Sequence, residues 1–307
     1  MALHCDRAKL QTRPRACPSE ISDFMPHILS VSSRVVRGMV GNTLASFVWQ
    51  RIGHAVWDVP TVVWDHHPGF GRPAGLTLTG AQIATLLADF RAPRLIDQTR
   101  LVASGYFAAT DQIDSVCDHI LALRAQGNTA PYCCDPVCGD LPGPYVPPAI
   151  LAGLRTRLLP LADIITPNRH ELGFLTGKPV TTNPEIVAAA RILGRPICLV
   201  TSAIGTTAAR IANLLVTPDK ALICETTRAN IAPNGTGDLM TALFVGLILK
   251  GIVPHLAMAS AAAIVHRILE ATQAGGTNEL DIVAAQAALV ATDLTCPVSE
   301  LTGDTHG

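Results

Sequence analysis

Asn234-Gly235-Thr236-Gly237-Asp238 leads directly into Leu239-Met240-Thr241-Ala242-Leu243-Phe244-Val245-Gly246-Leu247-Ile248-Leu249-Lys250. The two glycines permit a tight turn, and the apolar run predicts a buried helix that ends at Lys250 and Gly251. Asp238 then lies at the helix start, where unpartnered backbone N–H groups and the positive end of the helix dipole attract anions. The stretch therefore predicts a phosphate-binding turn whose carboxylate takes a proton from an attacking hydroxyl. An ordinary loop with a helix cap is the other interpretation of so short a motif.

The composition of the chain argues against two classes of partner. The 307 residues are 49% hydrophobic, which is enough for the core of one large α/β domain. The formal net charge is −1 and 15% of the residues are charged, so the basic surface that nucleic acids require is not expected. No apolar run reaches the roughly 20 residues needed to span a bilayer, so membrane insertion is not expected either.

Cysteine usage indicates the redox environment. The nine cysteines are odd in number, lack paired Cys-x-x-Cys spacing and lie mostly in apolar surroundings, where a thiol is a small hydrophobic group. We therefore expect a reducing, cytoplasmic location and no structural zinc.

The first 25 residues differ in character from the rest of the chain. They carry Arg7, Lys9, Arg13 and Arg15 among polar residues and show no apolar periodicity. A disordered N-terminal extension is the favoured interpretation. A transit peptide is the alternative, and the acidic residues and the missing amphipathic face argue against it.

Beyond residue 25, short apolar runs alternate with helix-like segments. Strands are predicted at 27–33, 56–63, 95–104, 131–134, 164–166, 197–201 and 209–216. Helices are predicted at 43–52, 79–90 with Thr79 as cap, 111–126, 150–159, 170–176, 185–193 and 239–249. This alternation is typical of an α/β fold and predicts a three-layer α/β/α sandwich with a mostly parallel central sheet. Residues 26–307 are expected to form a single domain.

Polar residues follow several of the predicted strands. In a parallel sheet ligands bind beyond the carboxyl ends of the strands, which makes these residues candidates for a site. They are Ser33, Asp65-His66-His67, Asp135, and Asn168 with Glu171. Singly each has a structural explanation: Asp135 before Pro136 can shape a turn, and Asn168 with Glu171 can form a helix capping box. Together they surround the glycine-rich turn with the oxygen ligands that a magnesium–phosphate unit prefers, which favours phosphoryl transfer.

Several motifs also carry a family resemblance. They are Ser33-Arg34-Val35-Val36 followed by Gly41-Asn42, Ser104-Gly105-Tyr106, Asp135-Pro136-Val137-Cys138-Gly139, Thr166-Pro167-Asn168-Arg169-His170-Glu171 and Gly235-Thr236-Gly237-Asp238. In this order they resemble pyridoxal kinases of the ribokinase-like superfamily, over roughly residues 28–290. The resemblance implies ATP-dependent phosphorylation of the 5′-hydroxymethyl group of pyridoxal, pyridoxine or pyridoxamine.

The resemblance assigns roles to individual residues. Asp238 resembles the catalytic base, and Gly235, Thr236 and Gly237 resemble the anion hole for the transferring phosphoryl group. The vitamer would contact Ser33, His67, Pro68, Tyr106 and Asp238. ATP would contact Asp135, Asn168, Glu171 and Thr201, with Asp135 and Glu171 also organising Mg²⁺. A K⁺ ion as further cofactor, a homodimer and a cytoplasmic location belong to the same expectation.

The chain departs from the family pattern in the loop after the second strand. That loop usually carries a threonine that contacts the substrate, and Pro68 stands at the aligned position, preceded by His66 and His67. One of these histidines could contact the pyridine ring in place of the threonine. Asn234 and Cys138 also differ from the commoner residues, but neither change removes a catalytic group.

Other functions remain open from the sequence. A hydroxymethylpyrimidine kinase shares the fold, nucleotide and base, although some such enzymes carry a cysteine in the anion-hole loop and residues 230–242 contain none. A sugar kinase of the superfamily needs a β lid, for which the segment 33–64 leaves little room. A vitamer-binding protein without turnover is the non-enzyme alternative, and the retention of Asp238 and Glu171 argues against it.

Overall fold

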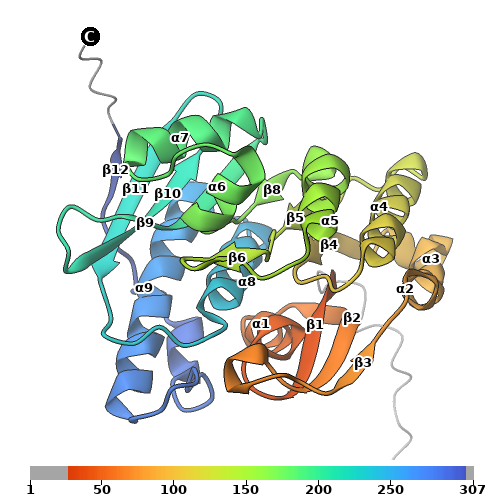
Figure 1. Cartoon of the computed structure of the whole chain (residues 1–307), viewed down its shortest axis with the longest axis horizontal. Coiled ribbons are helices and arrows are strands. Elements are labelled where there is room, and N and C mark those ends of the chain that lie inside the picture. Colours follow the sequence, from red (N-terminus) through yellow and green to blue (C-terminus); the bar gives the residue numbers. More distant parts are fainter. Residues whose placement is uncertain (1–26, 302–307) are drawn as a thin grey trace, which may run out of the picture.

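The computed structural model describes residues 27–301, and the expected N-terminal extension lies outside them. Within this range a ten-stranded sheet has the order β12-β11-β10-β9-β8-β5-β4-β1-β2-β3, and a two-stranded ribbon pairs β6 with β7 (Figure 1). The strands are β1 His27–Arg37, β2 Ala55–His66, β3 Gly75–Thr77, β4 Thr99–Ser104, β5 Tyr132–Cys134, β6 Gly139–Asp140, β7 Gly143–Pro144, β8 Ile164–Ile165, β9 Ile197–Ile204, β10 Arg210–Val216, β11 Ala221–Thr227 and β12 Val298–Glu300.

The middle of the sheet is parallel and its margins are antiparallel. The six neighbouring strands from β9 through β8, β5, β4 and β1 to β2 all pair in parallel. Strands β10, β11 and β12 at one side and β3 at the other are antiparallel additions. The predicted mostly parallel α/β sheet is therefore confirmed.

Helices cover both faces of this sheet. They are α1 Gly41–Arg51, α2 Gly80–Leu87, α3 Pro93–Ile96, α4 Thr110–Ala125, α5 Pro148–Gly153, α6 Arg169–Thr176, α7 Asn183–Ile192, α8 Thr236–Leu249 and α9 Pro254–Ala274. Buried residues of α2, α4, α5, α6 and α7 share one hydrophobic cluster with one face of the sheet. Those of α1, α8 and α9 share the other cluster with the opposite face. The predicted three layers are present.

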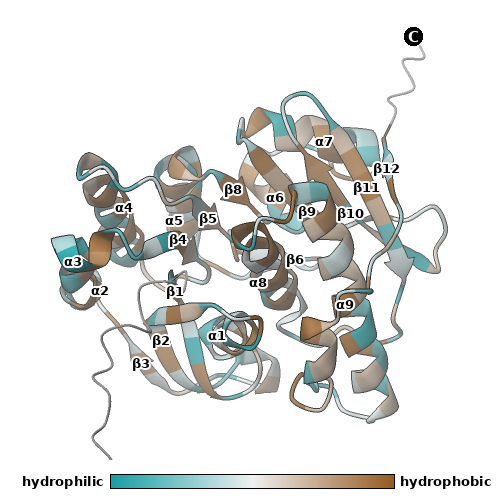
Figure 2. Cartoon of the chain, turned by 180° about the vertical axis from the view of Figure 1, so that it is seen from behind, coloured by the Kyte–Doolittle hydropathy of each residue, from teal (hydrophilic) through white to brown (hydrophobic). Residues whose placement is uncertain are grey.

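Alternation along the central strands explains the two clusters. Leu29, Cys134 and Ile165 belong to the first cluster, whereas their neighbours Ile28, Cys133 and Ile164 belong to the second. Successive side chains of a strand point to opposite faces, so a strand buried on both sides reads as a continuous apolar run. Helix α8 is apolar along most of its length because it is buried between the sheet and its neighbours α1 and α9 (Figure 2).

The element predictions hold except at particular places. Strand β1 continues to Arg37 and β2 to His66, so Ser33, Asp65 and His66 lie inside strands and not after them. The predicted strand 95–104 is wrong over its first four residues, because Pro93 opens the short helix α3 and β4 begins only at Thr99. The predicted helix 150–159 is not a single α-helix. Helix α5 ends at Gly153, and a π-helical turn over Leu154–Leu158 and a 3₁₀ turn that contains Pro160 follow.

Two further observations bear on the earlier expectations. Among residues 27–301, no helix is long and apolar enough to cross a membrane. The single-domain boundary at 26–307 stays a prediction, although the described residues share one continuous sheet.

Candidate active site

The glycine-rich turn before α8 forms the centre of the candidate site. Gly235 has φ of +87°, and a Cβ on it would overlap the carbonyl oxygen of Met39. Helix α8 therefore begins at Thr236 against the β1–α1 turn, and the hydroxyl of Thr236 donates to the Pro233 carbonyl at 2.8 Å. The first N–H groups of a helix have no partner inside it, and the space beside exposed Gly237 is open. This start is open to an anion, and the anion hole stays a prediction.

Asp238 is the third residue of α8 and is partly buried. Burial raises its pKa to about 6, and a hydrogen bond from the Gly41 backbone N–H opposes that rise. A carboxylate with a pKa near 6 is ionised at neutral pH and is basic enough to accept a proton in a transition state. The structure thus places a suitable general base beside the predicted anion hole.

Asp135 follows β5 and lies deeper in the same site. Its side chain is buried, and its Oδ2 accepts a hydrogen bond of 2.9 Å from Thr241 on α8. Thr241 Oγ1 also lies 2.9 Å from Thr166 Oγ1 after β8. Burial, followed by the negative charge of Asp238, raises the pKa of Asp135 to about 8. A buried carboxyl group whose ionisation is opposed by a second carboxylate nearby favours the binding of a cation.

Glu171 and Asn168 form the capping box of α6. The Glu171 carboxylate accepts the Asn168 N–H at 2.8 Å and the Cys138 N–H at 3.0 Å, one on each oxygen. The Asn168 side chain accepts two N–H groups of α6 and donates to the Gly139 carbonyl at 3.1 Å. Burial, together with the charge of Asp135, raises the pKa of Glu171 well above its ordinary value. Glu171 therefore fixes the loop after Asp135, whether or not it also contacts a metal.

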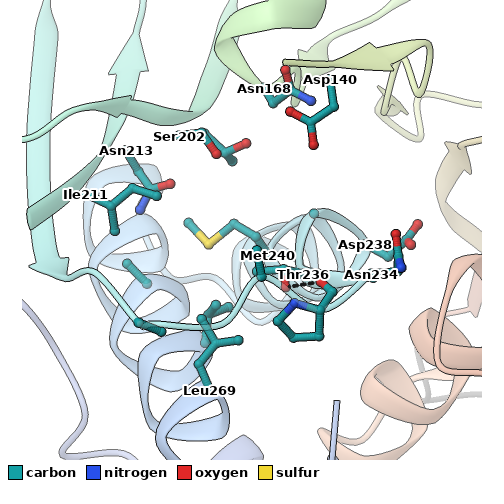
Figure 3. A pocket seen from close by; sticks show the side chains of 18 of the residues that line it. Asp140, Asn168, Ser202, Ile211, Asn213, Asn234, Thr236, Asp238, Met240 and Leu269 are labelled. Atoms are coloured by element: carbon teal, nitrogen blue, oxygen red, sulfur yellow. Dashed lines mark hydrogen bonds between the residues drawn. The ribbon is translucent and has the colours of Figure 1, made fainter. Parts of the chain in front are cut away.

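A cavity of about 480 Å³ joins these residues to the predicted nucleotide side. Its lining includes Asp135, Asn168, Glu171, Thr201 and the turn 234–238. Asn168 and Asp140 lie together on one wall, and Thr236 and Asp238 lie across from them (Figure 3). The predicted ATP contacts and the predicted base therefore meet in one space.

Thr201 lies within β9 and lines this cavity at a bulge in the pairing of β9 with β10. Its N–H donates to the Pro167 carbonyl at 3.0 Å, and it forms an isolated bridge with Asn168. The next residue, Ser202, has φ of +57°, a left-handed conformation unusual for a residue with a side chain. Ser202 lines the cavity, so the sequence analysis missed a candidate beside Thr201.

Apart from Asp238, the predicted vitamer contacts lie outside the described lining of this cavity. Ser33 is buried at a bulge of β1, and Gly41 packs so closely that a Cβ there would overlap the Ser33 side chain. Tyr106 is half-buried, and its ring lies edge-on to Trp64 with 5.6 Å between centroids. Ser33 is thus joined to Asp238 through Gly41.

His67 and Pro68 lie at the end of β2, and both nitrogens of His67 have partners within the protein. Its Nδ1 accepts the Gly69 N–H at 3.1 Å, and its Nε2 lies 3.4 Å from Glu279 Oε1. The ring is 6% exposed, which leaves it little surface for a ligand. Pro68 is exposed and opens a 3₁₀ turn over Pro68–Phe70. This turn lies near the anion hole, since a Cβ on Gly69 would be 2.6 Å from Asn234 Nδ2.

The residues present give Mg²⁺ a partial site. Within residues 27–301, no group of three or more His, Cys, Asp or Glu side chains is arranged to hold a metal ion. Asp135 and Glu171 can supply carboxylate oxygens, and Asp140 points into the same cavity (Figure 3). This donor set fits an ion that takes its other ligands from phosphates and water.

Comparisons with known proteins identify the family. A family model described as phosphomethylpyrimidine kinase matches residues 81–296. Pyridoxal kinase PdxY of Deinococcus radiodurans is 36% identical over 272 residues, which cover 85% of this chain and 91% of the relative. The chain belongs to the pyridoxal kinase family. The pyridoxine/pyridoxal/pyridoxamine kinase of Bordetella bronchiseptica is likewise 36% identical, over 86% of this chain and 95% of the relative.

Solved structures of pyridoxal kinases have the same fold. Pyridoxal kinase from Entamoeba histolytica matches with a TM-score of 0.84 and 25% identity, over 90% of this chain and all of that one. The enzyme from Leishmania donovani in complex with ADP and pyridoxamine matches with a TM-score of 0.83 and 25% identity, over 90% of this chain and 99% of that one. The predicted ribokinase-like fold is therefore confirmed for this pyridoxal kinase family member.

Sequence reasoning missed Asp140 as well as Ser202. Asp140 lies one residue after the Asp135–Gly139 motif, and a sequence signal was available because acidic residues close to a predicted site are candidates for a cation. Ser202 gave no such signal, because its left-handed backbone depends on how β9 pairs with β10 and β8.

Proposed function

We propose that this pyridoxal kinase family member transfers the γ-phosphoryl group of ATP to the 5′-hydroxymethyl group of pyridoxal and related vitamers. The observation that carries the proposal is the position of Asp238 beside the open N-terminus of α8, in a cavity shared with Asp135, Asn168 and Thr201. Curated relatives named pyridoxal kinases support it. So do solved relatives with bound ADP and vitamers.

The mechanism follows from these residues. Asp238 accepts the proton of the 5′-hydroxyl group, and the oxygen of that hydroxyl forms a bond to the γ-phosphorus. The bond between the γ-phosphorus and the oxygen that bridges it to the β-phosphate breaks, which releases ADP. The N–H groups of Thr236 and Gly237 stabilise the charge on the transferring phosphoryl oxygens. Asp135, Glu171 and Asp140 would hold Mg²⁺, which when bound neutralises phosphate charge. Ser33 and Tyr106 would position the ring on the side of Asp238 that faces β1.

A substrate panel tests the proposal. The purified full chain is incubated with Mg²⁺–ATP and pyridoxal, pyridoxine, pyridoxamine, hydroxymethylpyrimidine or ribose, and ADP release is measured. We expect release with the three vitamers well above that with the other two. Preference for hydroxymethylpyrimidine would instead agree with the description of the matching family model. Vitamer binding without ADP release would make the chain a binding protein.

The metal, the oligomeric state and the cellular location are proposals as well. We propose Mg²⁺ as the metal, a homodimer as the assembly and the cytoplasm as the location. The buried carboxylates support the metal, and the seven described cysteines, all free, support a reducing compartment. Removal of Mg²⁺ with a chelator, replacement of K⁺ by Na⁺ and light scattering after size-exclusion chromatography test the metal, a K⁺ requirement and the homodimer.

A further inference from the structure

The first turn of α1 connects the sheet to the proposed base. Gly41, its first residue, has φ of +52°, its N–H faces Asp238, and the Met39 carbonyl just before it packs against Gly235 at the start of α8. We propose that Asn42 is a positioning residue for phosphoryl transfer, because its buried side chain fixes this turn to β1 and β2 and so holds the Gly41 N–H against Asp238. The inference rests on the proposed function only for the role of Asp238 as base.

The Asn42 side chain is fully buried and makes three hydrogen bonds, all of them to β1 and β2. Its Oδ1 accepts the Ser30 hydroxyl at 2.7 Å. Its Nδ2 donates to the Ser32 carbonyl at 3.3 Å and to the Val59 carbonyl at 3.2 Å. A buried amide with such partners is costly to remove, because its loss takes a donor away from each of two carbonyl groups.

The sheet needs these donors at this place. Ser32 pairs with Pro60, whose nitrogen has no proton to donate, and the register of β1 against β2 shifts immediately afterwards at Ser33. The Asn42 amide supplies donors where the ladder is interrupted. One side chain therefore fixes both the bulge that carries Ser33 and the helix turn that contacts Asp238.

The rest of α1 is fastened to α8, which carries Asp238. Trp49 Nε1 donates to the Ala242 carbonyl at 2.8 Å, and His54 Nε2 lies 2.8 Å from the Gly246 carbonyl. The two helices lie side by side in both overall views (Figures 1 and 2). These contacts act further along α8, so they hold the helices together without setting the direction of the Gly41 N–H. Asn42 is the contact next to that group.

A matched control separates positioning from simple stability. Gln112 on α4 is also a fully buried amide, and its Nε2 donates to the Thr61 and Leu78 carbonyls at 3.0 and 2.6 Å. Asn42→Ala and Gln112→Ala therefore remove comparable buried bonds, but only the first lies next to Gly41. Ser30→Ala is a milder second variant, which removes only the hydroxyl that binds Asn42 Oδ1.

The first readout needs no substrate. Hydrogen exchange of the Gly41 amide is followed by NMR in protein labelled with ¹⁵N-glycine and corrected for each variant's global stability. We expect Asn42→Ala to speed this exchange by about tenfold or more, as the loss of a bond to a charged acceptor predicts, and Gln112→Ala to leave it within about twofold. If Asn42→Ala does not fold, Ser30→Ala decides, with an expected acceleration of about threefold.

The second readout is kinetic. We expect Asn42→Ala to lower kcat by about tenfold to 10²-fold, the usual effect of a small misplacement of a reacting group, and to leave the KM for ATP within about twofold. The described lining of the nucleotide cavity includes no residue of α1, which is why the KM should not change. Unchanged Gly41 exchange, or equal effects of Asn42→Ala and Gln112→Ala, would overturn the inference. If the parent releases no ADP in response to a vitamer, the proposed function is rejected. The exchange experiment would then still decide whether Asn42 positions the Gly41 N–H.

Discussion

Asp238, the proposed general base, must be ionised to accept a proton, and the fold opposes its ionisation. The pKa of this carboxyl is about 6 in the folded protein against 3.8 as its ordinary value. A carboxyl whose pKa rises on folding favours the folded state when it is protonated, and this contribution is lost as the pH rises through the folded pKa. The active site therefore costs stability at neutral pH.

This cost can be measured with Asp238→Asn. The amide keeps an oxygen to accept the Gly41 N–H but carries no charge, so the variant should be more stable than the parent at pH 7 by about 1–3 kcal/mol. The difference should develop between about pH 4 and 6 and be small below it. Thermal or urea unfolding across this range provides the test. A variant less stable than the parent at pH 7 would mean that the charge of Asp238 is well solvated.

Glu171 has two candidate roles, a helix cap and a contact of Mg²⁺, and substitution can distinguish them. Its carboxylate accepts backbone N–H groups on both oxygens, and Glu185 forms the same kind of capping box with exposed Thr182 at the start of α7. Glu171→Gln should lower stability by about 1–3 kcal/mol and raise the Mg²⁺ concentration needed for half-maximal rate. Glu185→Gln should leave the Mg²⁺ titration unchanged. Superimposable Mg²⁺ titrations for parent and Glu171→Gln would leave Glu171 a capping residue only.

The sequence predicts some site residues better than others for a physical reason. Asp135, Asn168 and Asp238 follow strand ends or begin helices, so local pattern and parallel topology are enough to bring them together. His67 stays a predicted vitamer contact; its Nδ1 accepts the Gly69 N–H, and its Nε2 lies 3.4 Å from Glu279 Oε1. Its partner Glu279 is 212 positions away in sequence, and such a contact has no local signal.

Helices and strands, like site residues, are predicted well where their sequence signal is local and poorly where it is not. The capping boxes and apolar runs that begin α2, α6 and α7 are local, and those helices were predicted within two residues at their starts. The length of β1 was not predicted, because its last residues pair with β2 beyond a bulge that depends on Asn42. Strand β11 and helix α9 were not predicted, and β11 is an antiparallel addition next to the polar lining of the cavity.

The turn after β2 is the element expected to set vitamer preference. Pro68 begins it, exposed and without an N–H, near Asn234 of the anion-hole turn. A threonine would add a hydroxyl worth about 1 kcal/mol in a hydrogen bond, so Pro68→Thr should change kcat/KM for one vitamer relative to another by up to about tenfold. The KM for ATP serves as the internal control. A common factor for all vitamers and ATP would mean that the turn acts through stability alone.

The packing of the whole molecule controls its thiol chemistry. All seven cysteines among residues 27–301 are buried and free. Burial raises the pKa of Cys133, Cys134 and Cys198, the second of these to about 12, whereas a hydrogen bond from Cys224 lowers the pKa of Cys296. We expect Cys296 to react with iodoacetamide at least about tenfold faster than Cys133, Cys134 or Cys198 in the native protein. Peptide mass spectrometry gives the order, and faster labelling of any of those three would contradict it.

In the proposed function, the whole fold presents the Asp238 carboxylate to the substrate hydroxyl beside the start of α8. The most direct test is the turnover of Asp238→Asn, followed as pyridoxal 5′-phosphate formed from ATP and pyridoxal, with exposed Asp219→Asn as the matched control. We predict a fall in kcat of about 10²-fold or more for Asp238→Asn, with ATP binding by calorimetry retained and Asp219→Asn equal to the parent. Turnover of Asp238→Asn within a few-fold of the parent would contradict the assignment of Asp238 as the base.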